Sequence, residues 1–485
     1  MSRSCTLTSL RALALALLAL IFASRPAFAQ EYPHPREMDL PETTFTRPSP
    51  DDVRAALDNG LVAYVVEEHE VPLVTLTVFV RGGTAYDDKQ GAAEALVGAL
   101  QRRAGTDGFR DHLRTMVADY AVTASPERIE VSLNVPAEHA AEAMALLADV
   151  LRQPALTEAH VQALRAGPAA QEEAGSGRYG EGGLQAASQR LREAVLGDHP
   201  YGHAPTSEEA SALMSEDVAA FHEAFFVPSN VVLAVSGDFD AAEARAMLEE
   251  HFGDWEGGEA PSLPAPPEVE PATERQIFAY DLDTRQAWLA LGHAIPPVAT
   301  EDQAALDVMN YILGGGHFDT RLFRATRDRR GLTNDASGFP EPGTQGPGTY
   351  AILTSGRHEV IPELVDLVMQ EVERIRTEPV EEEELFVARK ALAEGVYAMR
   401  FEDGNATART FALEWAERRD HEETATYPDR VRAVTSEDVR SAAQRYLHPE
   451  RMQMVIMGPL DQVREATDPN GSSTLAEFGS LTSEN

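Results

Sequence analysis

The sequence predicts an α+β protein with two tandem duplicated domains, each a mostly antiparallel sheet packed by helices. The first observation is an internal repeat: Ser-Glu-Asp-Val occurs at 215–218 and again, 221 residues later, at 436–439. Three further residues recur at the same offset, namely Pro228 with Pro449, Gly237 with Gly458, and Asp240 with Asp461. A chain of 485 residues can hold two domains of roughly 200 residues each, so a tandem duplication explains the repeat.

The second observation is that strand-like and helix-like patterns occur together in both halves. Runs of β-branched and aliphatic residues predict strands, and apolar residues three or four positions apart predict helices. In the first half the predicted strands are 61–66, 74–80, 128–135 and 231–235, and the predicted helices are 90–103 and 137–151. In the second half the predicted strands are 288–291, 349–354 and 454–457, and the predicted helices are 302–313 and 360–376. This mixture indicates sheets with helices packed on one side.

The N-terminus has the pattern of a secretory signal peptide. Arg3 and Arg11 flank the start of an apolar stretch, 12–23, and Ala-Phe-Ala at 27–29 is a cleavage site of the Ala-x-Ala type. An apolar stretch of this length is too short to cross a bilayer, which argues against a membrane anchor. We therefore expect cleavage near Ala29 and a periplasmic or secreted protein with no membrane span.

The rest of the chain divides at a segment rich in proline, glutamate and glycine. The predicted boundaries are a signal peptide at 1–29, an N-terminal lead-in at 30–50, a first domain at 51–256, a linker at 257–272, a second domain at 273–466 and a polar, frayed tail at 467–485.

Acidic residues outnumber basic residues by 79 to 41, which gives a formal net charge of −38. Such a surface repels nucleic acid and anionic lipid, so neither is expected as a partner. It could attract basic peptides, although solubility in a salty medium explains the composition better. The only cysteine, Cys5, lies in the predicted signal peptide. Disulfides, a thiol nucleophile and a cysteine metal site are therefore excluded from the mature chain.

Several short segments together point to a family. They are Val-Arg-Gly-Gly-Thr-Ala-Tyr at 80–86, Gly-Asp-His-Pro-Tyr-Gly at 197–202, Leu-Gly-Gly-Gly-His-Phe at 313–318, Thr-Arg-Leu-Phe at 320–323, Arg-Asp-Arg-Arg-Gly-Leu at 327–332 and Val-Thr-Ser-Glu-Asp-Val at 434–439. In order and spacing they resemble the insulinase/pitrilysin superfamily of zinc metallopeptidases, in particular its processing-peptidase-like branch, over nearly all of 51–459. The resemblance implies two duplicated domains arranged as a clam-shell around a peptide.

The resemblance also locates a degenerate zinc site. Active members carry His-x-x-Glu-His on the first helix, where two His ligate zinc and the Glu activates water. Here Glu94 stands at the first His position, Val97 at the Glu position and Gly98 at the second His position. The third ligand of the family corresponds to Glu172 or Glu173. The resemblance therefore implies no catalytic residue, no bound metal and no cofactor in this chain, with zinc only in a partner subunit.

The second half of the family can contribute an Arg and, seven residues on, a Tyr that bind the substrate near the scissile bond. This chain keeps the Arg as Arg327 and has Asn334 at the Tyr position. A surface salt bridge with Asp328 is an equally good explanation of Arg327. Tyr350 and Arg357, on a predicted strand and the turn after it, could line the chamber wall. The remaining predicted substrate contacts are Gly314, Gly315 and Gly316, which could instead permit a tight helix exit.

The resemblance implies a catalytically inactive, secreted homologue. It would act as the metal-free, substrate-binding and chamber-forming subunit of a heterodimer whose other chain, a homologous peptidase, carries the zinc motif. Unfolded or extended peptides would bind by adding a strand to an exposed sheet edge. The alternative is a non-proteolytic structural scaffold subunit of an envelope complex. The sequence alone leaves open whether any proteolytic role survives.

Overall fold

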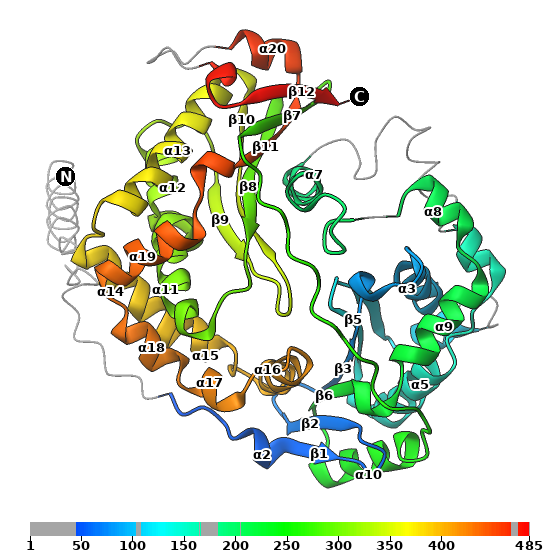
Figure 1. Cartoon of the computed structure of the whole chain (residues 1–485). Coiled ribbons are helices and arrows are strands. Elements are labelled where there is room, and N and C mark those ends of the chain that lie inside the picture. Colours follow the sequence, from blue (N-terminus) through cyan, green and yellow to red (C-terminus); the bar gives the residue numbers. More distant parts are fainter. Residues whose placement is uncertain are drawn as a thin grey trace, which may run out of the picture. The chain divides into compact units, whose positions relative to one another are not determined.

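The computed structural model describes residues 45–102, 108–163, 165, 183–203, 205–466 and 474–484. The described residues from Thr46 onward belong to one compact unit. Two six-stranded sheets lie in it, with the strand orders β1-β2-β6-β3-β5-β4 and β12-β7-β11-β8-β10-β9 (Figure 1). The predicted signal peptide at 1–29 lies outside the described residues.

The elements of the first half come in the following order. They are α2 (Pro50–Val53), β1 (Arg54–Ala56), β2 (Val62–Glu67), β3 (Leu73–Arg81), η2 (Thr84–Tyr86), α3 (Ala92–Arg102), α4 (Phe109–Thr115), β4 (Asp119–Ala124), β5 (Arg128–Pro136), η3 (Ala137–His139), α5 (Ala140–Arg152), α7 (Leu184–Leu196), α8 (Ser207–Ala212), α9 (Ser215–Phe225), η4 (Pro228–Asn230), β6 (Val231–Gly237) and α10 (Ala241–Phe252).

The second half repeats most of this order. Its elements are β7 (Gln276–Asp281), β8 (Gln286–Ile295), α11 (Thr300–Asn310), η5 (Tyr311–Gly315), η6 (His317–Asp319), α12 (Arg321–Phe323), η7 (Arg324–Asp328), β9 (Ala336–Glu341), β10 (Gly348–Arg357), η8 (His358–Val360), α13 (Ile361–Thr377), α14 (Glu382–Lys390), η9 (Ala391–Val396), α15 (Tyr397–Met399), α16 (Gly404–Ala416), α17 (His421–Ala425), α18 (Tyr427–Ala433), α19 (Ser436–Tyr446), η10 (Pro449–Arg451), β11 (Gln453–Gly458), α20 (Leu460–Glu465), η11 (Leu475–Glu477) and β12 (Ser480–Glu484). The segment 255–272, which includes the predicted linker, has neither helix nor strand.

The predicted α+β class and the tandem duplication are confirmed. Helices α9 and α19 start at the two Ser-Glu-Asp-Val copies and lead into the equivalent central strands β6 and β11. The same aspartate caps both helices: Asp217 accepts a hydrogen bond from the Met214 backbone N–H, and Asp438 accepts one from Thr435, each at 2.8 Å. Four of the five strand pairs in the first sheet are antiparallel, as are three of the five in the second.

The two sheets differ at one edge, and there the prediction of a frayed tail at 467–485 is wrong for the described residues 474–484, which include β12. In the first sheet the edge strand β1 comes from the start of the domain and runs antiparallel to β2. In the second, β12 comes from the end of the chain and runs parallel to β7. Leu475 and Phe478, just before β12, are buried and hold this segment against the second half. A sequence pattern misses β12 because its pairing uses backbone groups, which carry no side-chain signal.

Each sheet is covered on its second face by a helix from the other half of the chain. Helix α16, from the second half, lies on β2, β6 and β3, and helix α7, from the first half, lies on β8, β11 and β10 (Figure 1). Every residue of β6 and β11 is buried as a result. Strands buried on both faces have continuous apolar sequences, which explains why 231–235 and 454–457 show no alternation.

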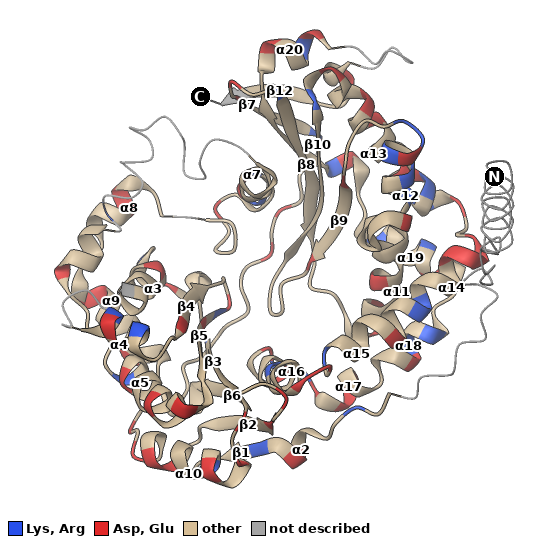
Figure 2. Cartoon of the chain, turned by 180° about the vertical axis from the view of Figure 1, so that it is seen from behind, with Lys and Arg blue, Asp and Glu red and all other residues tan. Residues whose placement is uncertain are grey.

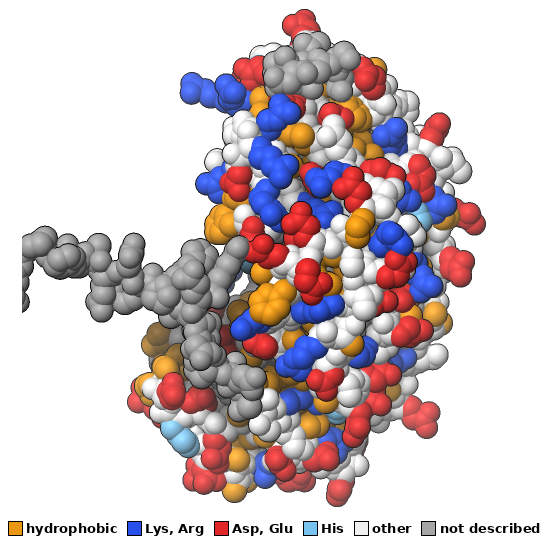
Figure 3. All heavy atoms as spheres, turned by 90° about the vertical axis from the view of Figure 1, so that its left-hand side faces the viewer, with side chains coloured by type: hydrophobic (Ala, Val, Ile, Leu, Met, Phe, Trp, Pro, Cys, Tyr) orange, Lys and Arg blue, Asp and Glu red, His pale blue; other side chains and the backbone are white. Residues whose placement is uncertain are grey.

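The acidic excess is spread over the molecule. Figure 2 shows Asp and Glu on helices of both halves, and Figure 3 shows them interspersed with Arg and apolar side chains on one face. Many arginines pair with these carboxylates across the two halves, as Arg409 does with Glu130 at 2.5 Å. No helix in the described ranges is long and apolar enough to cross a membrane.

Because α16 and α7 each pack on the sheet of the other half, we predict that the two halves unfold together. Phe411 of α16 is fully buried, and its ring lies 5.6 Å from that of Tyr64 in the first half. We expect Phe411→Ala to cost about 3–5 kcal/mol in the free energy of unfolding, in one transition, because it leaves a cavity in a core that both halves share. Urea unfolding, followed by circular dichroism and by tryptophan fluorescence, measures the free energy of unfolding and the number of transitions.

The matched control is Phe386→Ala, because Phe386 on α14 is 60 % exposed. We expect the control to change the free energy of unfolding by less than about 0.5 kcal/mol. Equal effects of the two substitutions, or two separate transitions in the native chain, would contradict the shared core.

Candidate functional site

Helix α3 occupies the position of the predicted metal-binding helix, and its side chains do not fit a zinc ion. Glu94 is exposed, while Val97 and Gly98 are half-buried and offer no ligand atom. Within the described ranges, no three His, Cys, Asp or Glu side chains form a group that could hold a metal. Glu172 and Glu173, the predicted counterparts of the third ligand, lie outside those ranges. One carboxylate on this helix cannot retain zinc alone.

The helix persists through contacts that need no metal. The Asp87 carboxylate accepts hydrogen bonds from the backbone N–H groups of Gly91 and Ala93, at 2.8 and 2.9 Å, where α3 begins. Burial raises the pKa of Asp87 to about 7, against the opposing effect of these hydrogen bonds. The buried side chains of α3 are Ala92, Ala93, Ala95, Leu96, Ala99 and Leu100. A cap and an apolar face therefore hold the helix.

Arg327 packs on aromatic rings at the surface of the second half. Its guanidinium lies 4.8 Å from the ring centre of Phe323 and 5.9 Å from that of Phe318. The two rings meet edge to face at 5.2 Å. Arg327 is exposed, and stacking of this kind orients a guanidinium while leaving its N–H groups available. The structure thus favours the stacked arrangement over the predicted salt bridge with Asp328.

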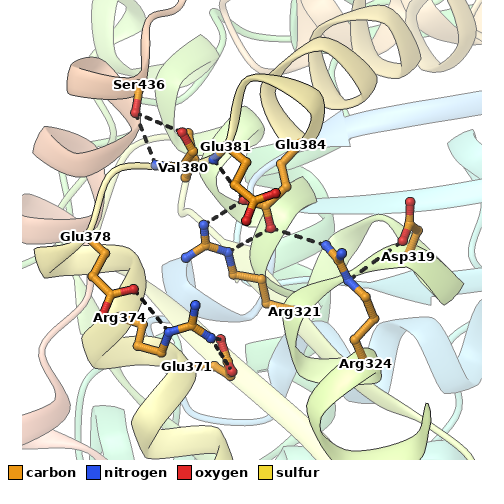
Figure 4. A network of polar contacts seen from close by, with 10 residues as sticks. All are labelled: Asp319, Arg321, Arg324, Glu371, Arg374, Glu378, Val380, Glu381, Glu384 and Ser436. Carbon is orange, nitrogen blue, oxygen red and sulfur yellow. Dashed lines mark hydrogen bonds and ion pairs between the residues drawn. The ribbon is translucent and has the colours of Figure 1, made fainter. Parts of the chain in front are cut away.

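An ion-pair network fixes the helical turn that precedes Arg327 (Figure 4). Arg321 binds both oxygens of Glu384, at 3.0 and 2.6 Å, and Arg324 binds the same carboxylate at 3.1 Å. Arg324 also lies 3.7 Å from Asp319. Burial alone would raise the pKa of Glu384, but the hydrogen bonds and charge of Arg321 outweigh it and hold the pKa below its usual value. The side chains of Arg321 and Glu384 are only 7 % and 12 % exposed.

The glycine run lies on a π-helical turn and is explained by close packing. Gly314 and Gly315 belong to η5, and Arg327 belongs to a second π-helical turn, η7. A Cβ atom at Gly314 would come within 2.5 Å of the backbone nitrogen of Gly338 in β9. At Gly316 it would come within 2.7 Å of Tyr311. The close packing explains the glycines as a tight helix exit and does not require a contact with substrate. Turns of the π-helical type nevertheless often mark functional sites.

The predicted residues do not gather at one place. Helix α3 contacts β4 and α9, whereas η7 contacts α12 and α13, so Glu94 and Arg327 belong to different surroundings. Asn334 is exposed in the loop before β9. Tyr350 cannot line a chamber wall: it is fully buried, and its hydroxyl donates a hydrogen bond to Asn310 Oδ1 at 2.8 Å. Their roles in binding substrate remain predictions.

A cavity of about 230 Å³ in the second half is not indicated by any pattern in the sequence. It is lined by α11, α17, α18, the β9–β10 loop, the turn after α16 and Arg400 after α15. Asp307 lies on its wall and accepts hydrogen bonds from the Tyr427 hydroxyl, at 2.7 Å, and from the Gln303 amide, at 2.9 Å. Burial raises the pKa of the Asp307 carboxyl. The adjacent pair Arg418-Arg419 also lines the cavity, but adjacent arginines are too common in sequences to predict one.

The Glu384 network predicts a stability effect with a defined pH dependence. Glu384→Gln leaves Arg321 nearly buried without its counter-charge, so we expect a loss of about 2–3 kcal/mol at neutral pH. Because the folded pKa of Glu384 is depressed, the wild-type advantage is complete above the usual value of 4.5 and disappears as the pH falls through the folded value. Urea unfolding of the native chain and of Glu384→Gln, from neutral pH to below the folded pKa of Glu384, tests this pH dependence.

Glu382→Gln is the matched control, since Glu382 begins the same helix and is 84 % exposed. An equal loss in the two variants, or a difference that does not shrink in acid, would refute the role given to Glu384.

Comparisons with known proteins show which proteins this chain resembles. Residues 212–392 match the model of the peptidase M16 inactive domain. A zinc protease of Mycobacterium leprae is 29 % identical over 280 residues, which is 55 % of this chain and 60 % of that protein. A non-peptidase homologue of Helicobacter pylori, YmxG, is 23 % identical over 277 residues, with coverage of 55 % and 62 %. The chain thus spans about 60 % of the length of the curated relatives it matches.

Solved structures show the same fold. A peptidase M16 inactive domain from Pseudomonas fluorescens superposes with a TM-score of 0.72 at 22 % identity, covering 84 % of this chain and 97 % of that one. Complex III2 from Candida albicans (0.67, 14 %) covers 86 % and 97 %, and the periplasmic protease PqqL from Escherichia coli (0.68, 14 %) covers 91 % and 52 %. The resemblance predicted from the motifs is confirmed: residues 212–392 match the model of the peptidase M16 inactive domain, and the chain is similar in sequence to proteins named as zinc proteases and in fold to an M16 inactive-domain structure.

Proposed function

We propose that this chain is a catalytically inactive M16 homologue that acts as the metal-free, substrate-binding and chamber-forming subunit beside a zinc-motif partner. The observation that carries the proposal is α3, which keeps its cap and apolar face but presents Glu94, Val97 and Gly98 at the motif positions. The match to an inactive-domain model and to a relative named as a non-peptidase homologue supports it. Zinc would then be held only by the partner.

Peptide binding is proposed at an exposed strand edge. Strands β4 and β9 are each the last strand of their sheet, so among the described residues one side of each has no neighbouring strand. An extended peptide could add to either edge through backbone hydrogen bonds, which give affinity with little sequence preference. Arg327, oriented on its two aromatic rings, would then donate hydrogen bonds to a peptide carbonyl held near the partner's zinc.

Export belongs to the same proposal. The N-terminal pattern predicts cleavage near Ala29, and the structural neighbour PqqL is described as a periplasmic protease. A periplasmic or secreted protein of this family would meet its partner and its peptides outside the cytoplasm.

A second candidate function is a structural scaffold without a role in proteolysis. It is favoured by one observation, the likeness of the fold to a chain of respiratory complex III. Under this alternative the chain associates with other envelope subunits, and neither Arg327 nor a strand edge need contact a peptide.

Co-expression with a homologue that carries His-x-x-Glu-His separates the two functions. We expect a stable heterodimer with chelator-sensitive peptidase activity, and no activity from the isolated chain after zinc is added. Arg327→Ala should lower kcat/KM of the heterodimer at least tenfold, because it removes a donor to the developing negative charge (roughly a hundredfold where one oxyanion-hole donor is lost).

The control is Arg329→Ala, an exposed arginine two residues away. Equal activity of the Arg327 and Arg329 variants, or failure of the chains to associate, would favour the scaffold. Hydrolysis by the isolated chain with zinc would refute both functions.

A further inference from the structure

The cavity between α11, α18 and the turn after α16 has an unusual charge for this protein. Four arginines line it, Arg400, Arg418, Arg419 and Arg430, against three carboxyl groups, Asp307, Glu417 and Glu423. Over the whole chain, by contrast, acidic residues outnumber basic ones by 79 to 41. Burial raises the pKa of Asp307. A raised pKa favours the neutral carboxyl, which repels an anion less than a carboxylate does. The cavity is therefore a local positive site on an acidic molecule.

Two of the four arginines, Arg400 and Arg418, have guanidinium groups that can bind an anion. Arg419 pairs with Glu417 at 2.8 Å, and Arg430 donates to the backbone carbonyls of Thr300 and Glu423. Arg400 and Arg418, in contrast, have no carboxylate within ion-pair distance in the described part of the chain. Arg400 is half-buried, with its guanidinium 5.5 Å from the ring centre of Tyr427. Unpaired guanidinium groups in a carboxylate-rich protein are ready to bind an anion.

The backbone at Arg418 is strained. Its φ is +58°, the left-handed conformation that usually takes glycine at the end of a helix, and it follows directly on α16. A residue with a side chain costs roughly 1 kcal/mol there. Strain of this kind is enriched at functional sites, although Val117, Ala155 and His317 share the conformation in this chain. The strained conformation holds the Arg418 side chain where it lines the cavity.

A second, smaller cavity of about 20 Å³ adjoins the first and shares Thr344, Gln345, Glu417 and Arg418 with it. Two donors on its wall, the Tyr86 hydroxyl and Arg81 Nε, are buried and have no hydrogen-bond partner among the described residues. Burial and the nearby charge of Arg418 lower the pKa of Arg81 to about 10, so this guanidinium still carries its charge. These donors face the same turn from the first half.

We propose that these adjoining cavities form an anion site that binds a carboxylate group through Arg400 and Arg418. The size fits a single acidic group, because about 230 Å³ is below the ~300–1,000 Å³ of ordinary ligand pockets. The charge fits one carboxylate group, since the larger cavity sets four arginines against three carboxyl groups, and the two charges of a single phosphate dianion would exceed that difference. The carboxylate comes from a small organic acid or from a peptide. The site needs no zinc-bearing partner, so it goes beyond the proposed function.

Isothermal titration calorimetry on the full chain, at constant ionic strength, tests the site with three probes: glutarate, the peptide Ala-Ala-Glu and inorganic phosphate. We expect saturable binding of glutarate, of the peptide, or of both, each more tightly than phosphate. Arg400→Gln and Arg418→Gln should each weaken that binding at least about tenfold, since each removes a charged hydrogen-bond donor. Glutarate alone identifies a small acid as the source, and the peptide alone identifies a peptide.

The matched control is Arg432→Gln, on α18 beside Arg430 but outside the cavity and paired with Asp429 at the surface. It should bind the probes as the native chain does.

Circular dichroism establishes that each variant is folded. Arg418→Gly gives a second test that is not expected to unfold the chain, because glycine relieves the strain at a φ of +58°. No binding of either carboxylate probe, equal or tighter binding of phosphate, or equal binding by the Arg400 and Arg432 variants would overturn the proposal.

Discussion

The exchange of α7 and α16 between the halves is the constraint on which the rest of the structure depends. Each sheet has one face covered by helices of its own half and one by a helix from the other. Strands β6 and β11 are buried throughout, and Phe411 of α16 reaches Tyr64 across the exchange. The end of α16 also packs on the first half, where the guanidinium of Arg81 lies 3.5 Å from the ring centre of Trp415. The cavity lined by Arg400 and Arg418 exists only because this helix is held in place.

Helix α3 is held in the fold by contacts that lie outside its motif positions. Asp87 and the apolar face of α3 stabilise the helix from positions that do not coincide with the motif. Glu94 is exposed, and Gly98 is half-buried, while Val97 is half-buried and packs against the core of the first half. The residues at the motif positions are therefore compatible with a stable helix, and the proposed function assigns the chain to binding and assembly.

Much of the fold follows from the sequence, because its central strands carry strong apolar patterns. The strands predicted at 74–80, 128–135 and 231–235 lie within β3, β5 and β6, and the repeat correctly pairs α9 with α19. The apolar patterns do not predict the edge strands β1, β4, β9 and β12, since strand edges pair through the backbone and tolerate polar side chains, and they do not predict the inner strand β7 either. Nor does any local pattern show that α7 and α16 exchange sheets. Tyr350 shows the same limit: only the tertiary packing distinguishes a core tyrosine from one on a chamber wall.

The candidate sites divide in the same way. Glu94, Val97 and Gly98 could be placed by motif alone, whereas Arg400, Arg418 and Tyr86 meet only through tertiary contacts.

The central claim, that α3 cannot retain a metal, is tested most directly by the zinc content of the full chain after purification from zinc-supplemented medium and dialysis. We predict much less zinc than one ion per chain, with no change in Glu94→Ala. A stoichiometric zinc ion that survives dialysis and is lost in Glu94→Ala would contradict the account.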